Sequence, residues 1–311
     1  MGNAGCRVFR EPKIHSGKAI RKHQVICEKP AWLKLLFMEA KMKITMLGTG
    51  NAMVTECYNT CFVINREESN GERHFLVDGG GGNAIFRQLR SAGYDWTDMK
   101  EIFVTHKHID HILGIIWLIR SVCQAIGQGN YEGDVNIYAH DEVIALITNL
   151  TVQLFWEKQT RFIGERIHLI TVHDKETREI NGSKVTFFDI QSIKDKQFGF
   201  SMELDGGEKL TCCGDEPYNQ CEKEYVQGSK WLLHEAFCLH SQADTFKPYE
   251  KYHSTVKDAC ELAERLNVQN LILYHTEDKN IRNRKELYYK EGSQYFHGGL
   301  YIPDDLESIS L

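Results

Sequence analysis

The chain of 311 residues carries 37 Lys and Arg against 43 Asp and Glu, a formal net charge of -6, and 42% of its residues are hydrophobic. This balance predicts a globular protein and excludes an intrinsically disordered chain. A surface devoted to nucleic acid is disfavoured, because such surfaces are usually basic, although a local basic groove is compatible with the charge. Ten cysteines without paired zinc-ribbon spacing predict free thiols in a reducing compartment, so we expect a cytoplasmic protein.

The first 41 residues differ in pattern from the rest of the chain. They mix basic residues with cysteine without a clear hydrophobic period, and a strand-like pattern begins abruptly at Met42. We therefore expect residues 42–311 to form one folded domain, and residues 1–41 to be a peripheral N-terminal extension or a start-codon artefact. No segment approaches eighteen apolar residues and no signal-peptide pattern is recognised, so we expect no membrane partner.

From residue 42 onward, strand-like and helix-like patterns alternate along the chain. Strands are predicted at residues 44–47, 61–64, 75–77, 102–104, 135–138, 167–172, 184–189, 198–203, 209–213, 231–233 and 271–274. Helices are predicted at residues 84–92, 114–126, 142–154 and 256–266. Sheets that alternate with helices and place polar residues at strand ends imply layered α/β packing with a site along one edge.

Residues 105–111, with the sequence THKHIDH, bring four metal-competent side chains together directly after a predicted strand. Because side chains alternate along an extended segment, His106 and His108 can face one metal while Asp110 and His111, in the turn that follows, face a second. Imidazole and carboxylate without thiolate favour zinc, with manganese or iron as alternatives. A histidine-rich surface loop is the other interpretation, but the complete spacing favours two adjacent ions.

Two later positions have the right placement to complete such a centre. Asp215 follows a strand and a glycine, and His275 follows the apolar strand 271–274. Taken alone, a Gly-Asp turn is usually an ordinary bend and a strand-terminal histidine is usually a satisfied surface group. Together with residues 105–111, both are predicted to be metal ligands.

The chain resembles the metallo-β-lactamase-fold hydrolases of the ribonuclease Z-like branch, from about residue 42 to the C-terminus. The matching motifs are LGTG at 47–50, NT at 59–60, VDGG at 77–80, the run 105–111, GD at 214–215, HEA at 234–236, HST at 253–255 and HT at 275–276. The resemblance implies a four-layer αββα sandwich with a dinuclear zinc site at the shared edge of its sheets. It also implies a homodimer.

The same resemblance implies roles for particular residues. The ligands fall into two sets: His106, His108 and Asp215 for the first zinc, and Asp110, His111, Asp215 and His275 for the second. Asp78 is expected to hold the histidines in place. Asp110 would also orient the nucleophile, and Glu235 with His253 would form a dyad that protonates the leaving oxygen. A histidine held by a carboxylate suits this role, because the carboxylate raises its pKa and fixes its tautomer.

Gln191 departs from the pattern of similar sequences. At the aligned position, those sequences carry a histidine that is a ligand of the first zinc. An amide oxygen is a poorer zinc ligand than imidazole, so we expect the first site to be weakened or completed by water. His140, His168 and His173 are near in sequence but not in the matching frame. A further hypothesis follows: a non-catalytic metal-binding or ligand-binding relative.

Two weaker features have ordinary explanations. Residues 79–82 could present backbone N-H groups to a phosphate, but a tight turn after Asp78 is the simpler interpretation. The basic residues after His275 could attract an anionic substrate, although a solvated helix face is expected. They are Lys279, Arg282, Arg284 and Lys285.

The substrate is predicted from what the chain lacks relative to ribonuclease Z enzymes. Those enzymes carry a long arm that clamps transfer RNA, whereas only the short stretch 192–214 occupies the corresponding place here. We therefore expect a phosphodiesterase for a small phosphodiester, such as a cyclic or short nucleotide. Transfer RNA 3' processing and ester or lactam hydrolysis are alternatives, and the Glu235–His253 pair favours a phosphodiester. Flavodiiron-type redox chemistry is disfavoured, because that branch has a carboxylate where this chain has His108.

Overall fold

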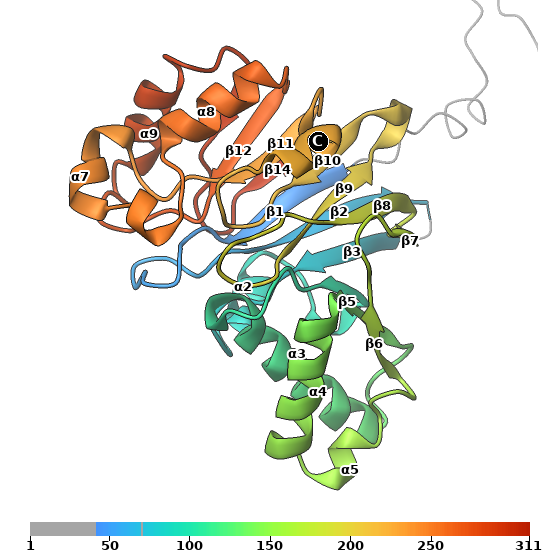
Figure 1. Cartoon of the computed structure of the whole chain (residues 1–311). Helices are drawn as coiled ribbons and strands as arrows, with labels where there is room; N and C mark the ends of the chain where they lie inside the picture. The colour runs from blue at the N-terminus through green and yellow to red at the C-terminus, as the bar shows by residue number, and fades with distance from the viewer. Residues whose placement is uncertain (1–41, 70) are drawn as a thin grey trace, which may run out of the picture. The chain divides into compact units, whose positions relative to one another are not determined.

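Two sheets of seven strands each form the centre of the computed structural model, which describes residues 42–69 and 71–311 (Figure 1). The first sheet contains β1 (Met42–Gly48), β2 (Cys61–Glu68), β3 (Gly71–Val77), β4 (Glu101–Phe103), β5 (Val135–Ala139), β6 (Ile167–Thr171) and β14 (Ser308–Ser310), in the order β14-β1-β2-β3-β4-β5-β6. The second contains β7 (Thr177–Ile180), β8 (Ser183–Asp189), β9 (Phe198–Glu203), β10 (Lys209–Cys212), β11 (Trp231–Glu235), β12 (Asn270–Tyr274) and β13 (Gly299–Tyr301), in the order β13-β12-β11-β10-β9-β8-β7. The extension predicted at residues 1–41 lies outside the described residues.

Helices connect these strands and cover the outer faces of the sheets. The α-helices are α2 (Ile85–Ser91), α3 (Ile109–Gly127), α4 (Asp141–Leu154), α5 (Glu157–Thr160), α6 (Lys223–Val226), α7 (Ala243–Phe246), α8 (Val256–Arg265) and α9 (Arg284–Gly292). Short 3-10 turns are η1 (Trp96–Asp98), η2 (Asp205–Gly207), η3 (Gln220–Glu222), η4 (His240–Gln242) and η5 (Tyr249–Lys251).

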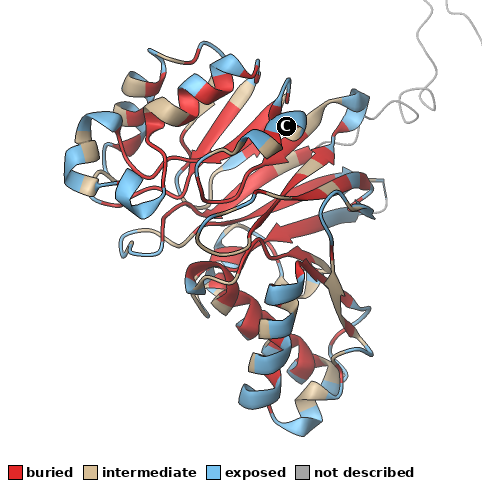
Figure 2. Ribbon diagram, viewed as in Figure 1, coloured by how far each residue is buried: buried red, intermediate tan, exposed pale blue. Residues whose placement is uncertain are grey.

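Three hydrophobic cores hold four layers together. Between the sheets, the ring centroids of Phe75 and Phe200 lie 5.6 Å apart and those of Phe103 and Phe187 lie 4.9 Å apart. A second core joins the first sheet to α2, α3 and α4, and a third joins the second sheet to α8 and α9. The burial of strands and inner helix faces is visible in Figure 2. This arrangement confirms the four-layer αββα sandwich, with apolar burial as its main driving force.

Most predicted elements are present, but α3 begins at Ile109 and not near residue 114. Asp110 and His111 therefore lie in the first helical turn and not in a preceding loop. The apolar period of the helix starts only after these polar residues, which hid its beginning in the sequence. The short strands β7, β13 and β14 and the helix α9 were not predicted, because they are too short or too polar to show a clear pattern.

Helix α3 is long and apolar enough to cross a membrane by length and composition alone. The expectation that no segment approaches this composition was too strict. Its apolar face, with Ile112, Ile115 and Ile119, is buried in the core against the first sheet. A buried core helix can have the same length and apolar composition as a membrane-spanning helix.

The start of α3 packs directly on the turn that follows β3. Gly79 N donates to His111 O at 2.9 Å, and Gly114 N donates to Gly80 O at 3.0 Å. A Cβ atom on Gly114 would lie 1.9 Å from Gly79 O, so only glycine allows this approach. The backbone N-H of Gly79 is therefore already hydrogen-bonded within the protein. Residues 79–82 form a packed turn after Asp78, as predicted, and this N-H is not available to a phosphate.

Gly114→Ala is expected to destabilise the fold by about 1–3 kcal/mol, because the added methyl group overlaps backbone and must push α3 from the turn. Urea unfolding monitored by circular dichroism measures the change. Gly82→Ala is the matched control, since a Cβ atom there meets nothing within 4 Å. Equal unfolding midpoints for the two variants would contradict this account of the contact.

Candidate metal centre

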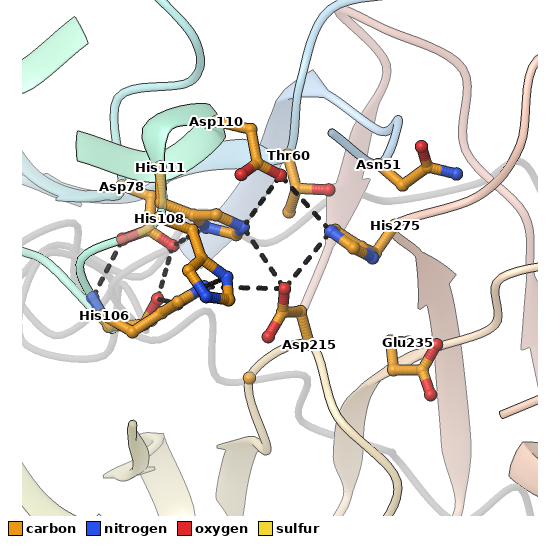
Figure 3. A network of polar contacts seen from close by, with 12 residues as sticks. Asn51, Thr60, Asp78, His106, His108, Asp110, His111, Asp215, Glu235 and His275 are labelled. Carbon is orange, nitrogen blue, oxygen red and sulfur yellow. Dashed lines mark hydrogen bonds and ion pairs between the residues drawn. The ribbon is translucent and has the colours of Figure 1, made fainter. Parts of the chain in front are cut away.

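The predicted ligands gather in one cluster, and they lie after strand ends or in the first turn of α3 (Figure 3). Asp78 follows β3 and residues 106–111 follow β4, which pairs with β3 in parallel. Asp215 follows β10 and His275 follows β12, and both strands pair in parallel with β11. Because parallel strands end at the same edge, side chains distant in sequence meet there.

Asp215 lies at the centre of this group and is 3% exposed. Its Oδ2 is 3.6 Å from His106 Nε2, 3.5 Å from His111 Nε2 and 3.3 Å from His275 Nε2. Three imidazoles from two separate segments therefore face one carboxylate oxygen. This is the placement of a ligand shared by two cations.

A second carboxylate lies on one side of Asp215. Asp110 Oδ2 is 3.4 Å from His111 Nε2 and 3.6 Å from His275 Nε2. Asp110, His111 and His275 offer ligand atoms that all lie within 4.8 Å of one another, as do His106, His111 and Asp215. The structure thus brings together five of the six predicted metal ligands in two overlapping groups.

His108, the sixth predicted ligand, lies beside the first group and is half-buried. Its Nδ1 is 2.9 Å from His106 Nε2, and its Nε2 is 3.1 Å from Asp195 Oδ2. The two histidines therefore turn adjacent nitrogens toward the same space, as alternation along the segment after β4 predicted. Asp195 was not predicted as a neighbour.

Asp78 supports the histidines from behind. His111 Nδ1 donates to Asp78 Oδ2 at 2.7 Å, and Thr105 donates its hydroxyl to Oδ2 at 2.8 Å and its backbone N-H to Oδ1 at 2.9 Å. Asp78 adopts a left-handed φ of 58°, a conformation that is unfavourable for a non-glycine residue. Its contacts leave His111 Nε2 facing the two carboxylates, as expected for a carboxylate behind a metal ligand.

The chemistry of this cluster fits a divalent metal. His111 Nε2 and His275 Nε2 are buried without a hydrogen-bond partner. Burial raises the pKa of Asp215, but the charges of His106 and His275 hold that pKa well below its usual range. Burial lowers the pKa of His111, but the Asp110 and Asp78 carboxylates raise it well above its usual value. Buried carboxylates and unpartnered imidazoles need a cation, and a metal can replace the protons they would otherwise hold.

Gln191 and the three other histidines lie outside this cluster. Gln191 is exposed, with a φ of 56°, and its backbone N-H donates to Asp189 Oδ1 at 2.8 Å. His140 is buried at the N-terminus of α4, His168 contacts Asp134 and His173 is exposed. None of these side chains belongs to the described metal-ligand groups.

Gln197, and not Gln191, is the glutamine whose side-chain amide contacts the group formed by His106, His111 and Asp215. It is 2% exposed, and its Nε2 lies 2.8 Å from His106 Nδ1 and donates to Asp215 Oδ1. Sequence reasoning missed both Gln197 and Asp195, because neither belongs to a ligand motif or follows a strand. Only the path of the loop between β8 and β9 brings them to the cluster.

Glu235 and His253 form a pair beside the second group. His253 Nδ1 is 3.5 Å from Glu235 Oε2, Ser254 N donates to Glu235 Oε1, and the His253 ring stacks on Phe237 at 4.9 Å. Glu235, His253 and His275 offer atoms within 4.8 Å of one another. Burial lowers the pKa of His253, but the neighbouring Glu235 carboxylate raises that pKa above the usual value. His253 is therefore a candidate proton donor next to the metal cluster.

The basic residues after His275 do not form one solvated helix face. Arg284 is 1% exposed and donates to Thr276 Oγ1 at 2.6 Å and to Pro303 O at 2.9 Å. The expectation of a solvated face is wrong for this residue. Its guanidinium ties the segment after β12 to the C-terminal segment and supports the backbone next to His275.

Asp215→Ala is expected to abolish the rise in melting temperature that zinc gives the wild-type chain. Both ligand groups lose their shared oxygen, and a ligand at about 100 times its Kd stabilises a fold by about 2.7 kcal/mol. Differential scanning calorimetry of chelator-treated protein, with and without zinc, measures the effect. Asp134→Ala removes an exposed carboxylate that pairs with Arg166 and serves as control. An unchanged zinc response in Asp215→Ala would exclude Asp215 as a ligand.

Known proteins of similar sequence and fold show the family of this chain. Ribonuclease Z of Nanoarchaeum equitans (strain Kin4-M) is 25% identical over 307 residues, covering 86% of this chain and 92% of the relative. The metallo-β-lactamase fold protein YhfI from Bacillus subtilis superposes with a TM-score of 0.69 at 18% identity, over 87% of this chain and 99% of that protein. Unliganded yeast PDE1 superposes with a TM-score of 0.65 at 16% identity, over 88% and 100%.

These similarities confirm the metallo-β-lactamase fold and the ribonuclease Z-like branch. With the histidine and aspartate groups, they identify a metal-dependent hydrolase of ribonuclease Z-like type. Residues 42–296 match the model of the family described as Anti-Pycsar protein Apyc1. The chain therefore belongs to the Anti-Pycsar protein Apyc1 family.

Proposed function

We propose that this chain is a zinc-dependent phosphodiesterase that hydrolyses a small phosphodiester, such as a cyclic or short nucleotide. One observation carries the proposal: the Glu235–His253 pair adjoins the metal-ligand cluster through His275. A centre that only activates water has no need of a second proton donor. A phosphodiester leaves as an alkoxide, which gains from protonation as the P–O bond breaks.

The ligand set supports zinc, because imidazole and carboxylate without thiolate form typical catalytic zinc sites. Manganese is the alternative. When bound, two such ions lower the pKa of a coordinated water to about 7 and stabilise the attacking and leaving oxygens. His106, His108 and Asp215 would hold the first ion. Asp110, His111, Asp215 and His275 would hold the second.

The protein's own groups complete the reaction. Asp110 lies between His111 and His275 and can accept a hydrogen bond from the attacking water, which aligns it with the phosphorus. His253 gives its proton to the leaving oxygen as the P–O bond breaks. Glu235 orients the imidazole and favours its protonated form, and the Phe237 ring fixes its plane.

The short connection between β8 and β10 supports a small substrate. In the described structure, the segment from Asp189 to Lys209 contains a loop, β9 and one 3-10 turn. By the family resemblance, this segment is the place where a transfer RNA clamp would be inserted. The similarity to a ribonuclease Z supports RNA as the second candidate substrate, so both must be tested together.

A substrate panel tests this proposal. Zinc-loaded protein is incubated with 3',5'-cyclic nucleotides, dinucleotides, a transfer RNA precursor and a lactam, and products are resolved by liquid chromatography. We expect turnover of the cyclic or short nucleotides, with Asp110→Ala inactive as a control for contaminating enzymes. Cleavage of the RNA precursor alone would establish the second candidate, and turnover of the lactam alone would exclude a phosphodiesterase.

The dyad also predicts the pH dependence. His253 must be protonated to act as an acid, so the rate should fall as pH rises through its raised pKa. Glu235→Gln removes the charge that raises this pKa and leaves burial to lower it, so the alkaline limb of kcat should move to lower pH. Glu264→Gln, in the exposed Glu264–His297 pair, is the matched control. A limb that stays in place in Glu235→Gln would contradict the assignment.

We propose that a second copy of the chain covers the exposed apolar side chains of α3, α4 and the segment after α4, which are Ile109, Trp117, Val152, Leu154 and Trp156. Sedimentation velocity would test this homodimer.

We also propose a cytoplasmic location. Eight cysteines with free thiols among the described residues support a reducing, cytoplasmic environment.

A further inference from the structure

We propose that the loop between β8 and β9, residues 190–197, organises the first metal site from outside, through Asp195 and Gln197. The inference rests on the two-metal centre of the proposed function and not on its substrate. It assigns positioning roles to two residues that belong to neither ligand set. It also explains how the first site keeps its shape although Gln191 is exposed.

Asp195 fixes the orientation of His108. Its Oδ2 is 3.1 Å from His108 Nε2, and its Oδ1 is 2.6 Å from Lys107 Nζ. A carboxylate can only accept, so the ring proton of His108 belongs on Nε2 and the lone pair belongs on Nδ1. Nδ1 is the nitrogen that lies 2.9 Å from His106 Nε2. A carboxylate behind a metal-binding histidine orients the ring and strengthens it as a ligand.

Gln197 joins the other two ligands of the first site. Its Nε2 donates to Asp215 Oδ1, and its Oε1 accepts from Asp215 N at 3.4 Å. The same Nε2 lies 2.8 Å from His106 Nδ1, where the Thr105 hydroxyl also lies at 2.9 Å. These contacts occupy the outer atoms, so Asp215 Oδ2 and His106 Nε2 are left to face the ion. Because the Thr105 hydroxyl donates its proton to Asp78, it accepts from His106 Nδ1, so the lone pair of this imidazole belongs on Nε2.

The loop is held in place by contacts that do not involve the cluster. Ile190 N donates to Gln197 O at 3.1 Å, and Phe198 N donates to Thr105 O at 3.1 Å. Lys196 Nζ pairs with Asp141 Oδ1 at 2.6 Å. The loop is thus closed on itself and tied to the segment that carries His106. Its two polar side chains are therefore positioned before any ion binds.

The consequence is a first site built from His106, His108 and Asp215, with an outer layer of Asp195 and Gln197. Three protein ligands leave an open coordination position, which a catalytic site needs for water or substrate. Asp195 and Gln197 contact the outer atoms of the ligands, so the loop stabilises the site and leaves that position free.

Zinc titration of metal-free, full-length protein against a chromophoric chelator tests this inference. We expect two binding steps for the wild type. In Asp195→Asn, one step should weaken by about 10–100-fold while the other is unchanged, as found when partners of metal ligands are removed. In Gln197→Leu, the same step should weaken more than the other, because Gln197 contacts His106 of the first site and Asp215 of both sites. Asp134→Asn alters a carboxylate that pairs with His168 outside the cluster, so it is the matched control and should titrate as the wild type.

Cobalt absorption spectra and urea unfolding of the metal-free variants provide two further readouts. A changed spectrum for one of two bound cobalt ions, with unchanged metal-free stability, would support a positioning role. Two wild-type steps that neither variant shifts would overturn the inference, as would equal weakening of both steps with loss of metal-free stability. No titration uses a substrate, so an inactive substrate panel would overturn the proposed function alone.

Discussion

The buried carboxylate of Asp215 is the group on which the rest of the site depends. It lies among three imidazole nitrogens, and Asp110 places a second carboxylate beside two of them. Removing such charges from water costs several kcal/mol for each ion unless cations neutralise them. The surrounding contacts therefore make sense as a frame for two cations. Asp78, Gln197 and Asp195 each turn a ligand so that its free atom faces the cluster.

The fold supplies this frame through strand ends and one close helix contact. Parallel pairs in both sheets end at the same edge, which brings residues after β3, β4, β10 and β12 together. The contact between Gly79 and Gly114 seats the first turn of α3 beside Asp78. Asp110 lies in that first turn, where the helix dipole favours a carboxylate. His275, like Asp78, takes a left-handed φ, which turns its ring into the cluster.

The sequence predicted the fold and the candidate ligands that gather in the cluster, because both leave local signals. The strands have short apolar runs, and residues 105–111 combine four metal-competent side chains in one segment. Asp215 and His275 could be found because each follows a strand. Their mutual distances could not be predicted, since these depend on how two sheets align their edges.

Other features carry no local signal. Gln197 and Asp195 act only because a loop folds back on His106 and His108, and Gln191 looked important because an alignment gives position and not orientation. Arg284 resembled its basic neighbours in sequence, although it is buried and they are not. Burial of a charged side chain depends on tertiary partners, here Thr276 and the carbonyl of Pro303. Such residues become visible only when the elements are packed.

Anomalous diffraction at the zinc edge, from crystals of the full-length protein loaded with zinc, tests the central claim most directly. The account predicts two peaks about 3.5–4 Å apart, on either side of Asp215 Oδ2. One should be bordered by His106 and His108, and the other by His111 and His275. A single peak, or peaks whose ligands exclude Asp215, would contradict a two-metal centre built on this carboxylate.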